Sequence, residues 1–397
     1  MKVLIINSGP KPLPAVNGGG VETLIQNIID NDKNNELTIV SYFDEKALEE
    51  SKLYKDVRFI YINFNSIVFI FLRLIYYFSN HILHHDVGNA LTSILRYKID
   101  YSQFDVIICE NGVRLGRNIR KLYNGRLILH LHNDWLNKYT IEAEKYKNSY
   151  DEIWVISNFL KKRVEEISGE AKVKILYNGV DNSLFSPINP IKRSTFRAQY
   201  NIDKDDLVLA YCGRIVPEKG CIQLIKAFKR ITTKFTNCKL LIIGGFSESD
   251  SYAKLLLSES DTNIIFTGYV NHGDLPQIMG IADIGIAPTI HFDNCYEGTE
   301  YLGVIECFNL TIIEFLSLGI PVIATNSGGM PEIVDGFMPW TSVSARDSEF
   351  EEAIVDLLCD IISNEKWKDL QIISKERAAF FSTEMYIKSY LNYLSDI

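Results

Sequence analysis

The sequence lacks several short motifs that mark common classes of protein. Its seven cysteines form no C-x-x-C pair and no Cys/His cluster with the spacing of zinc ligands. An odd, scattered set of this kind indicates reduced thiols in a cytosol rather than a disulfide framework. Neither G-x-G-x-x-G nor the Walker sequence G-x-x-x-x-G-K-S/T occurs, so the motifs give little support for a dinucleotide or a nucleoside triphosphate.

Positive charge and long apolar stretches are also scarce. The formal net charge of −9 argues against nucleic acid as the main partner. The most apolar run, residues 67–78 (IVFIFLRLIYYF), is shorter than the roughly 20 residues of a membrane span, and Arg73 interrupts it. It favours either a buried helix or an exposed amphipathic face that touches a membrane surface. Residues 1–7 are too short for a signal-peptide core, and we expect them to form a first buried strand.

The sequence does contain the rhythm of an α/β protein. Its 397 residues are too many for one typical core, and 47% apolar with 23% charged residues is an ordinary globular composition. Short apolar runs alternate with longer amphipathic segments, which predicts parallel sheets with crossover helices. Helices are expected at 21–30, 113–123 and 384–394, among others, and strands at 3–7, 37–42, 58–62, 106–109, 127–130, 153–156, 174–177, 207–211, 239–243, 264–267, 284–287 and 321–325.

The rhythm breaks where turn residues and prolines cluster between residues 178 and 190, as in a linker. We therefore expect two Rossmann-like domains, 1–186 and 187–375, followed by a C-terminal helix within 376–397. Ligand sites favour domain interfaces and the carboxyl ends of parallel strands. Both rules predict a site in a cleft between the two domains.

Residues 212–220 (CGRIVPEKG) directly follow a predicted strand of the second domain. Arg214 offers a planar fork of donors and Lys219 offers a point charge, a pairing that suits a diphosphate. The alternative is a solvated loop that carries an Arg–Glu ion pair.

Residues 306–314 (ECFNLTIIE) place two carboxylates, Glu306 and Glu314, on either side of an apolar helical pattern. Asn309 is expected to cap a helix from Leu310 onward, which would leave the first amides of that helix free for phosphate oxygens. Glu306 would precede the helix, within reach of a sugar, and Glu314 would lie inside it, where it could accept hydrogen bonds from ribose hydroxyls. The alternative is one exposed loop glutamate and one glutamate on a helix surface.

The first domain has a glycine-rich candidate segment, residues 17–22 (NGGGVE), which follows the first strand and opens a helix. Glycines such as Gly19 and Gly20 allow the backbone to approach a ligand closely, and the helix N-terminus favours an anion. The alternative is a plain flexible turn.

Two histidines form a second candidate in the first domain. Alternation along the strand points His130 and His132 to one face, and the strand end places His132 at the cleft. His132 is either a ligand contact or an ordinary hydrogen-bonded polar residue. Metal binding by the pair is not expected, because no nearby carboxylate pair completes a plausible site.

A basic group accompanies the predicted helix at 113–123. Arg114, Arg117 and Lys121 are spaced for one face of that helix. They form either a solvated basic face or a phosphate-binding face for an anionic or lipid-linked acceptor.

Taken in order, these motifs resemble those of the retaining GT-B glycosyltransferases of the GT4-type family, the glycosyl transferases group 1. Glu306 and Glu314 match its E-x7-E signature, and residues 213–220 match G-R-x-x-x-E-K-G. The resemblance implies the GT-B fold, in which two Rossmann-like domains face each other across a cleft. The first domain would bind the acceptor, the second would bind the nucleotide-sugar donor, and the last helix would pack back on the first.

The resemblance also implies roles for individual residues. Arg214 and Lys219 would hold the donor diphosphate and stabilise its departure, while Glu306 would lie near the donor sugar. Glu314 would bind the ribose, and His132 would contact sugar hydroxyls, so that Glu306, Arg214, Lys219 and His132 form the catalytic group. The donor-binding set would be Gly19, Gly20, Gly213, Arg214, Lys219, Tyr269, Val270, Glu306, Phe308, Asn309, Leu310, Thr311 and Glu314, with the base near Tyr269 and Val270.

The chain departs from the family's usual pattern at two places. Asn309 stands where a glycine is common, so the backbone would approach the diphosphate less closely. Residues 289–305 are longer than the usual link before the first glutamate, and they could form a lid or a sugar-specificity loop.

The implied reaction moves a sugar, with a UDP-sugar favoured, to an acceptor hydroxyl with retention of the anomeric configuration. The nucleotide-sugar is a co-substrate, and neither cofactor nor metal is required, since residues 203–205, the D-x-D-like string, read as a turn. We expect a growing cell-surface glycan or glycolipid as acceptor, lipid-linked and assembled at the cytosolic membrane face, because of the apolar run at 67–78 and the basic group. The alternatives are an inactive GT-B subunit that scaffolds a partner transferase and a nicotinamide-dependent oxidoreductase.

Overall fold

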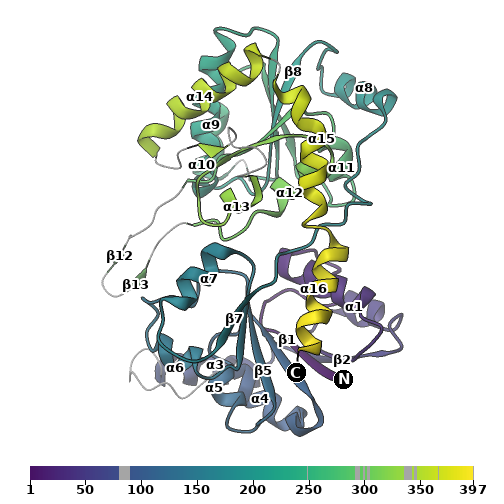
Figure 1. Cartoon of the computed structure of the whole chain (residues 1–397), viewed down its shortest axis with the longest axis vertical. Helices are drawn as coiled ribbons and strands as arrows, with labels where there is room; N and C mark the ends of the chain where they lie inside the picture. The colour runs from purple at the N-terminus through teal and green to yellow at the C-terminus, as the bar shows by residue number, and fades with distance from the viewer. Residues whose placement is uncertain are drawn as a thin grey trace. The chain divides into compact units, whose positions relative to one another are not determined.

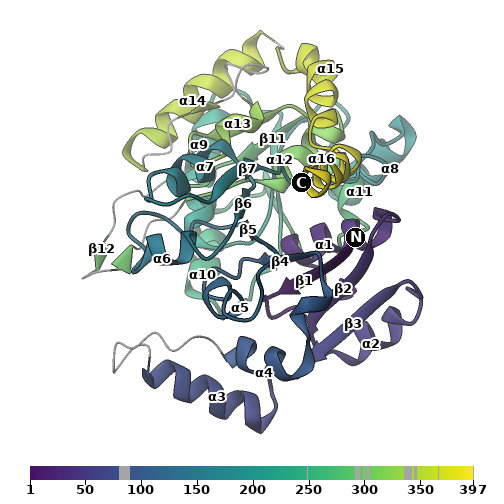
Figure 2. The same ribbon diagram turned by 60° about the horizontal axis from the view of Figure 1, so that its bottom comes forward.

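The structure is a computed structural model of the chain, and it describes residues 1–79, 90–247, 249–290, 296–297, 300–301, 305–334, 342–343, 347–364 and 366–396. The chain divides into two compact units, Met1–Tyr177 with Ile387–Ile397, and Asn178–Tyr386. Each unit is a parallel sheet packed against helices (Figures 1 and 2). The division thus falls after Tyr177, whereas the sequence predicts a boundary after residue 186.

The first unit is built on a seven-stranded parallel sheet in the order β3-β2-β1-β4-β5-β6-β7. All the strands predicted in this half form. The five inner strands are apolar runs buried on both faces of the sheet, whereas the edge strands β3 and β7 are partly exposed. The order reverses between β1 and β4, which is the point where such sheets bind ligands. The strands are β1 (Lys2–Asn7), β2 (Glu36–Tyr42), β3 (Val57–Ile62), β4 (Val106–Glu110), β5 (Arg126–Leu131), β6 (Glu152–Val155) and β7 (Lys172–Ile175).

Short polar side chains begin several helices of this unit. Asp44, Ser66 and Ser157 each accept a hydrogen bond from the backbone N–H three residues later, and so cap the free amides of a first turn. They precede α2 (Glu45–Ser51), α3 (Ile67–Tyr77) and α7 (Asn158–Glu165); the other helices are α1 (Gly20–Asn31), α4 (Ala90–Lys98), α5 (Gly116–Ile119) and α6 (Ala143–Lys147).

Helix α5 is much shorter than the helix predicted over residues 113–123. Tertiary hydrogen bonds hold this segment instead of a continuous helix. The Gly116 N–H donates to the Tyr150 hydroxyl at 2.8 Å, and the Arg120 guanidinium donates to Asp151 at 2.6 Å. The local pattern is apolar enough for a longer helix, but only one turn forms: the Gly116 contact lies at its first residue, and the Arg120 contact directly follows its last.

The predicted basic helix face is therefore wrong. Only Arg117 lies in α5, while Arg114 precedes the helix and Lys121 follows it. Arg117 also lies 3.3 Å from the Glu142 carboxylate, which offsets its charge.

Helix α3 shows that the buried-helix interpretation of the apolar run is wrong. Phe69 is its buried residue, at 7% exposed, whereas Ile67 is 86% exposed. Val68, Ile70, Phe71, Leu74, Ile75 and Tyr77 are exposed as well. Among the described residues, no helix combines the length and the apolar character needed to cross a membrane.

The second unit has a six-stranded parallel sheet in the order β10-β9-β8-β11-β14-β15, which reverses between β8 and β11. The strands predicted for this half all form, and the two-residue β15 is an addition too short to be read from the sequence. The strands are β8 (Leu207–Cys212), β9 (Cys238–Ile243), β10 (Ile264–Gly268), β11 (Ile284–Ala287), β14 (Val322–Thr325) and β15 (Ser342–Val343); β12 (Tyr296–Glu297) and β13 (Glu300–Tyr301) form a separate antiparallel pair.

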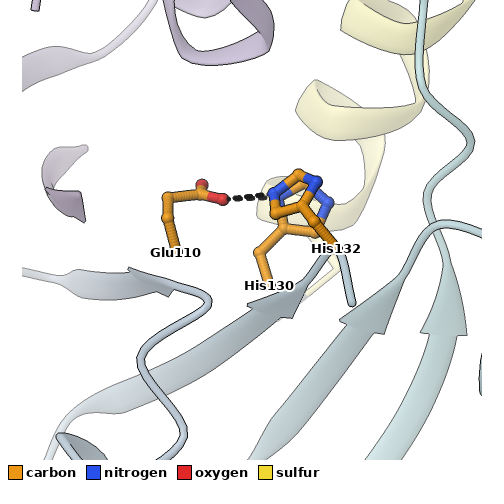
Figure 3. Close-up of side chains that lie close together, drawn as sticks. All are labelled: Glu110, His130 and His132. Carbon is orange, nitrogen blue, oxygen red and sulfur yellow. Dashed lines mark hydrogen bonds and ion pairs between the residues drawn. The ribbon is translucent and has the colours of Figure 1, made fainter. Parts of the chain in front are cut away.

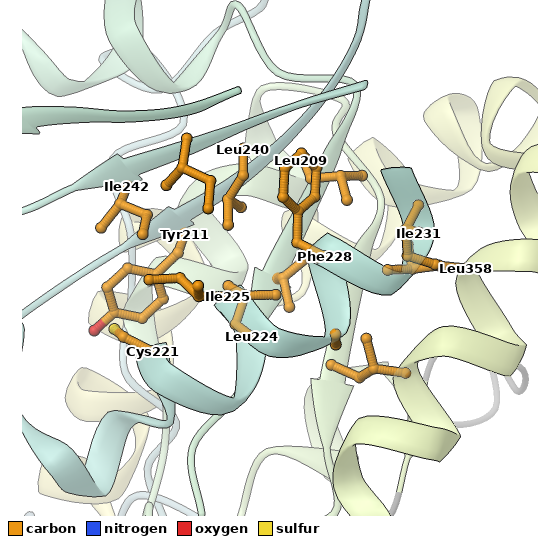
Figure 4. Close-up of a cluster of buried hydrophobic side chains, with 14 of the residues drawn as sticks. Leu209, Tyr211, Cys221, Leu224, Ile225, Phe228, Ile231, Leu240, Ile242 and Leu358 are labelled. Carbon is orange, nitrogen blue, oxygen red and sulfur yellow. The ribbon is translucent and has the colours of Figure 1, made fainter. Parts of the chain in front are cut away.

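The hydrophobic core of the second unit positions the loop between β8 and α9, which carries part of the candidate site. Leu209 and Leu240 of the sheet pack against Leu224 and Phe228 of α9 and Leu358 of α14, and all five are 0% exposed (Figure 4). This packing locks β8 to α9 and so positions the loop between them. The helices of this unit are α8 (Pro190–Gln199), α9 (Cys221–Thr232), α10 (Ser251–Glu259), α11 (Leu275–Met279), α12 (Leu310–Ser317), α13 (Pro331–Val334), α14 (Asp347–Ser363) and α15 (Lys366–Ala379).

The C-terminal helix α16 (Thr383–Ser395) begins in the second unit and ends in the first. Tyr390 and Tyr393 place their rings 6.1 Å and 5.8 Å from the buried Trp154 ring of β6. The Arg126 guanidinium donates to the carbonyls of Tyr393 at 2.5 Å and Leu394 at 2.8 Å. Both carbonyls lie in the last turn of α16, where a helix leaves its own carbonyls unsatisfied, so Arg126 caps the helix.

Removing this cap should loosen the C-terminal helix. Arg126→Met keeps the apolar stem but loses the charge-assisted hydrogen bonds, at a cost of about 2 kcal/mol. We expect hydrogen exchange of the amides near Tyr390 to accelerate about thirtyfold. Lys172→Met, an exposed change on the edge strand β7, is the matched control. Equal protection of α16 in both variants would show that ring packing alone holds the helix.

Candidate functional site

The loop after β8 is held in one conformation by contacts that only glycine permits. The Tyr211 hydroxyl donates to the Arg214 carbonyl at 2.6 Å. Gly220 has a φ of +72°, and a Cβ there would lie 1.9 Å from the Pro288 carbonyl oxygen. The loop that contains Gly213, Arg214 and Lys219 is therefore pressed against the segment that follows β11, at the switch point of the sheet.

Lys219 and Glu306, predicted from separate motifs, form an ion pair with side chains only 18% and 17% exposed. The turn after β14 holds Glu306 in this place. The Gly329 N–H donates to the Glu306 carbonyl at 2.9 Å, and a Cβ at Gly328 would lie 2.2 Å from that same oxygen. Three strand ends thus meet around one charged pair.

Helix α12 presents free amides at the same edge of the sheet. The Asn309 side chain accepts a hydrogen bond from the Ile312 N–H at 3.2 Å, so the predicted cap forms. The N–H groups of Leu310 and Thr311 have no partner among the described residues. Arg214 is exposed, and its guanidinium has no partner in the described part of the chain either. Amides and guanidinium are the donors that phosphate oxygens bind.

Glu314 lies inside α12 and is 8% exposed, so it is not a surface glutamate. His272, in the loop after β10, places its Nε2 3.7 Å from Glu314 Oε1, and its ring lies 5.4 Å from the Phe185 ring. The interaction with Glu314 raises the pKa of His272 above 6.5, although burial opposes the shift. Sequence reasoning missed His272, because the pair joins the loop after β10 to helix α12, which lies far along the chain.

The other residues of this unit that were predicted to bind the donor differ in how far their side chains are exposed. Tyr269 is 78% exposed and Val270 half-buried, just after β10. Phe308 is buried, and its ring packs against Phe381 at 5.6 Å, so its side chain serves the core and only its backbone is left for a ligand. The predicted lid, residues 289–305, lies largely outside the described residues.

In the first unit, the glycine segment before α1 already holds a negative charge. Glu22 is 6% exposed, and a Cβ at Gly19 would lie 2.2 Å from its Oε2. A carboxylate in the first turn interacts favourably with the positive end of the helix. The close packing explains Gly19, whose φ is +125°, but the occupied helix end disfavours a second anion beside Gly20.

In the first unit, three buried side chains, Glu110, His130 and His132, lie in contact at the ends of β4 and β5 (Figure 3). Glu110 Oε2 lies 2.7 Å from His132 Nε2 and 3.0 Å from His130 Nδ1. Glu110 and His130 are each 1% exposed, and His132 is 6% exposed. The two histidines share a face, as predicted, but the sequence did not identify Glu110, which parallel pairing of β4 with β5 sets opposite His130.

This arrangement sets the charge states of two of the three groups. Burial alone would raise the pKa of the Glu110 carboxyl, but the charge and hydrogen bonds of the two rings outweigh it and lower the pKa to about 2. Burial, followed by the neighbouring His130 ring, lowers the pKa of His132 to about 4. At neutral pH, Glu110 is therefore ionised and His132 is neutral.

Two imidazoles and a carboxylate are also a ligand set that zinc accepts, and their ligand atoms lie within 4.8 Å of one another. The separations of 2.7 Å and 3.0 Å are those of direct hydrogen bonds. Hydrogen bonding therefore explains the group better than a metal does.

Two Rossmann-like units, each with polar groups at its switch point, define the architecture of a GT-B glycosyltransferase. The fold agrees with solved structures: Anabaena HepE in complex with UDP superposes with a TM-score of 0.75 at 18% identity and covers 100% of both chains. The family glycosyl transferases group 1 matches residues 192–372, and glycosyltransferase family 4 matches residues 18–184.

The chain belongs to this glycosyltransferase family. Lipopolysaccharide 1,2-N-acetylglucosaminetransferase of Salmonella typhimurium is 30% identical over 298 residues, which cover 72% of this chain and 71% of that protein. The GDP-mannose-dependent alpha-(1-6)-phosphatidylinositol monomannoside mannosyltransferase of Mycobacterium tuberculosis is 29% identical over 215 residues, 53% of each chain. Membership of the family confirms that the protein is a glycosyltransferase and argues against the oxidoreductase alternative.

The pairing of His272 with Glu314 predicts a titration that can be observed directly. Because the pKa of His272 is raised, the pair is intact at low pH and is lost as the pH rises through that pKa. In an NMR titration we expect a His272 midpoint above 6.5, and Glu314→Gln should return it toward 6.5. A midpoint at or below 6.5 in the unmodified protein would contradict the pairing.

Proposed function

We propose that the protein is a retaining, metal-independent glycosyltransferase that transfers a sugar from a nucleoside diphosphate-sugar, preferably a UDP-sugar, to a hydroxyl of a cell-surface glycan or glycolipid. The observation that carries this proposal is the free N-terminus of α12, with the unpartnered Arg214 and the half-buried Lys219 in the same unit. Together these groups supply amide and cationic donors to a diphosphate as negative charge develops on it. That role requires no metal.

The Lys219–Glu306 ion pair supports a mechanism in which the donor diphosphate competes with Glu306 for Lys219. Without donor, Glu306 compensates the lysine charge; with donor, the phosphate oxygens would share Lys219, and Glu306 would be released toward the sugar. A route in which the departing diphosphate takes the acceptor proton needs no protein nucleophile. We therefore favour a front-face route, in which the bond from the anomeric carbon to the diphosphate breaks while the acceptor oxygen bonds to that carbon. The acceptor proton passes to the departing diphosphate oxygen.

A UDP-sugar is preferred because a structural relative was crystallised with UDP, although the mycobacterial relative is named as GDP-mannose-dependent. Glu314 would bind the ribose, and Tyr269 and Val270 would lie near the base. Thermal-shift measurements with UDP, GDP and ADP, each with EDTA or with Mg²⁺, test the base and the metal independence together. A ligand that binds only the folded state raises the midpoint, so a shift by one nucleotide in EDTA is expected. A shift that appears only with Mg²⁺ would refute metal independence.

Substitution of the helix cap separates diphosphate binding from helix stability. Asn309→Asp caps α12 as well as asparagine does, so the free energy of unfolding should be unchanged or slightly higher. Its carboxylate would repel a diphosphate by about 1–2 kcal/mol, and calorimetry should show Kd for UDP rising about tenfold. Asn309→Ser, which caps without charge, is the control and should bind UDP as the unmodified protein does. Equal affinity in all three would show that the diphosphate does not bind at this helix.

The finer proposal that the acceptor is lipid-linked is supported by α3. Its exposed apolar residues surround most of the helix, which is too short to cross a bilayer and suited to lie in its surface. Arg73 on α3 and Arg96 and Lys98 at the end of α4 are exposed, which favours anionic lipid. A surface helix of this kind would bring the first unit to an acceptor held in the membrane.

Vesicle flotation tests this contact. We expect the protein to float with vesicles of phosphatidylglycerol, and Phe71→Ser with Leu74→Ser should abolish binding because insertion buries these side chains. Leu53→Ser with Ile191→Ser, which changes equally exposed apolar residues elsewhere, is the matched control. No flotation of the unmodified protein, together with turnover of a water-soluble acceptor, would refute the membrane proposal.

A further inference from the structure

The Glu110–His132 pair leaves one ring nitrogen of His132 without a hydrogen-bond partner. His132 Nε2 lies 2.7 Å from the ionised Glu110, so the proton of the neutral ring is on Nε2 and Nδ1 is bare. Nδ1 is buried and has no partner among the described residues. A buried acceptor without a donor is unfavourable, and a group that supplies an O–H or N–H would remove that cost.

The backbone of His132 is also held by a hydrogen bond, in addition to the side-chain hydrogen bond to Glu110. The His132 N–H donates to Asn111 Oδ1 at 2.8 Å, and the Asn111 N–H donates to the His130 carbonyl at 2.8 Å. Asn111 itself adopts a left-handed conformation with a φ of +53°. Such a conformation persists where the surroundings require it, often at functional sites. The position and the tautomer of His132 are therefore both set by the end of β4.

His130 also stabilises the ionised form of Glu110. It lies directly before the strand end and donates to the same Glu110 oxygen, at 3.0 Å. With two donors on Oε2, the carboxylate stays ionised and cannot itself give a proton to His132. The carboxylate can thus only accept, and the His132 tautomer does not invert.

We propose that Glu110 is a positioning residue that locks His132 in its Nε2–H tautomer, so that Nδ1 accepts a hydrogen bond from a hydroxyl of a sugar ligand. This inference rests on the proposed transferase function. A sugar fits because the ligand must donate to a neutral acceptor beside a carboxylate, and its hydroxyls are neutral donors, whereas a phosphate or a carboxylate ligand would place a second negative charge next to Glu110. Because Nδ1 is buried in the structure, binding of the hydroxyl requires the neighbouring atoms to move aside. The hydroxyl belongs to the donor sugar or to the acceptor sugar.

Glu110→Gln tests the lock with little change in shape. Its amide can donate to the rings, so the tautomer of His132 should no longer be fixed. Nitrogen-15 NMR of the histidine-labelled chain should show a bare Nδ1 on His132 in the unmodified protein and a mixture or the inverse in Glu110→Gln. Cys109→Ala, the neighbouring position on the opposite face of β4, controls for loosening of the strand and should leave the tautomer unchanged. A protonated Nδ1 in the unmodified protein would overturn the proposal.

Kinetics with the UDP-sugar that the unmodified protein turns over give the second readout. Glu110→Gln should raise KM for a sugar at least tenfold while calorimetry shows unchanged affinity for UDP, because UDP is bound by the second unit. A higher KM for the UDP-sugar in hydrolysis without acceptor assigns the hydroxyl to the donor, and a higher KM for the acceptor alone assigns it to the acceptor. Unchanged KM values would refute the inference. Absence of UDP binding in the unmodified protein would instead refute the proposed function.

Substitution of His132 tests whether Nδ1 is the atom that accepts the hydrogen bond from the sugar hydroxyl. Asn offers a side-chain oxygen near the position of Nδ1, whereas Leu offers none, so His132→Asn should retain more activity than His132→Leu. Equal losses would contradict an acceptor role. Metal analysis of the purified chain is the last arm, since stoichiometric zinc that is lost in His130→Ala would assign the group to a metal and overturn the proposal.

Discussion

The parallel pairing of strands is the constraint on which the candidate site depends. In each unit it brings the carboxyl ends of neighbouring strands, and the starts of the helices that follow them, to one edge of a sheet. In the second unit this edge gathers the loop after β8, the turn that holds Glu306 and the free amides of α12. In the first unit it gathers Glu110 and His132. No single segment contains a complete site, and each depends on the register of the whole sheet.

Charge compensation within each unit explains why only some of these groups are available to an anion. Glu306 pairs with Lys219, and Glu314 lies beside His272. Glu22 already occupies the positive end of α1. The N-terminus of α12 and the Arg214 guanidinium are the groups of the site left without an internal counter-charge in the described residues. A dianionic leaving group is therefore better served by the second unit than by the glycine segment of the first.

Apolar periodicity predicted nearly all the strands, because a strand buried on both faces must be a continuous apolar run. It failed where tertiary contacts or solvent decided the outcome. The pattern at 113–123 suits a continuous helix, but only the one-turn α5 forms, and a hydrogen bond from the Gly116 N–H to the Tyr150 hydroxyl fixes its first residue. The run at 67–78 is apolar enough for a core, and nothing in its pattern distinguishes a buried helix from the exposed α3. The exposure of a helix depends on which other helices and strands pack against it, and the residues of the helix do not determine this by themselves.

The two α/β halves, the family and the residues that carry its motifs could be read from the amino-acid sequence, because these are local patterns of residue type and spacing. Asn309 as a helix cap could be read in the same way, since a cap bonds to its own helix. Which residues meet could not be read in this way: Lys219 with Glu306, His272 with Glu314, and Glu110 with His132. The members of each pair lie on different strands, loops or helices, so their contact is set by sheet register and by the packing of loops and helices. The tautomer of His132 is likewise a tertiary property, because it follows from a carboxylate on the neighbouring strand.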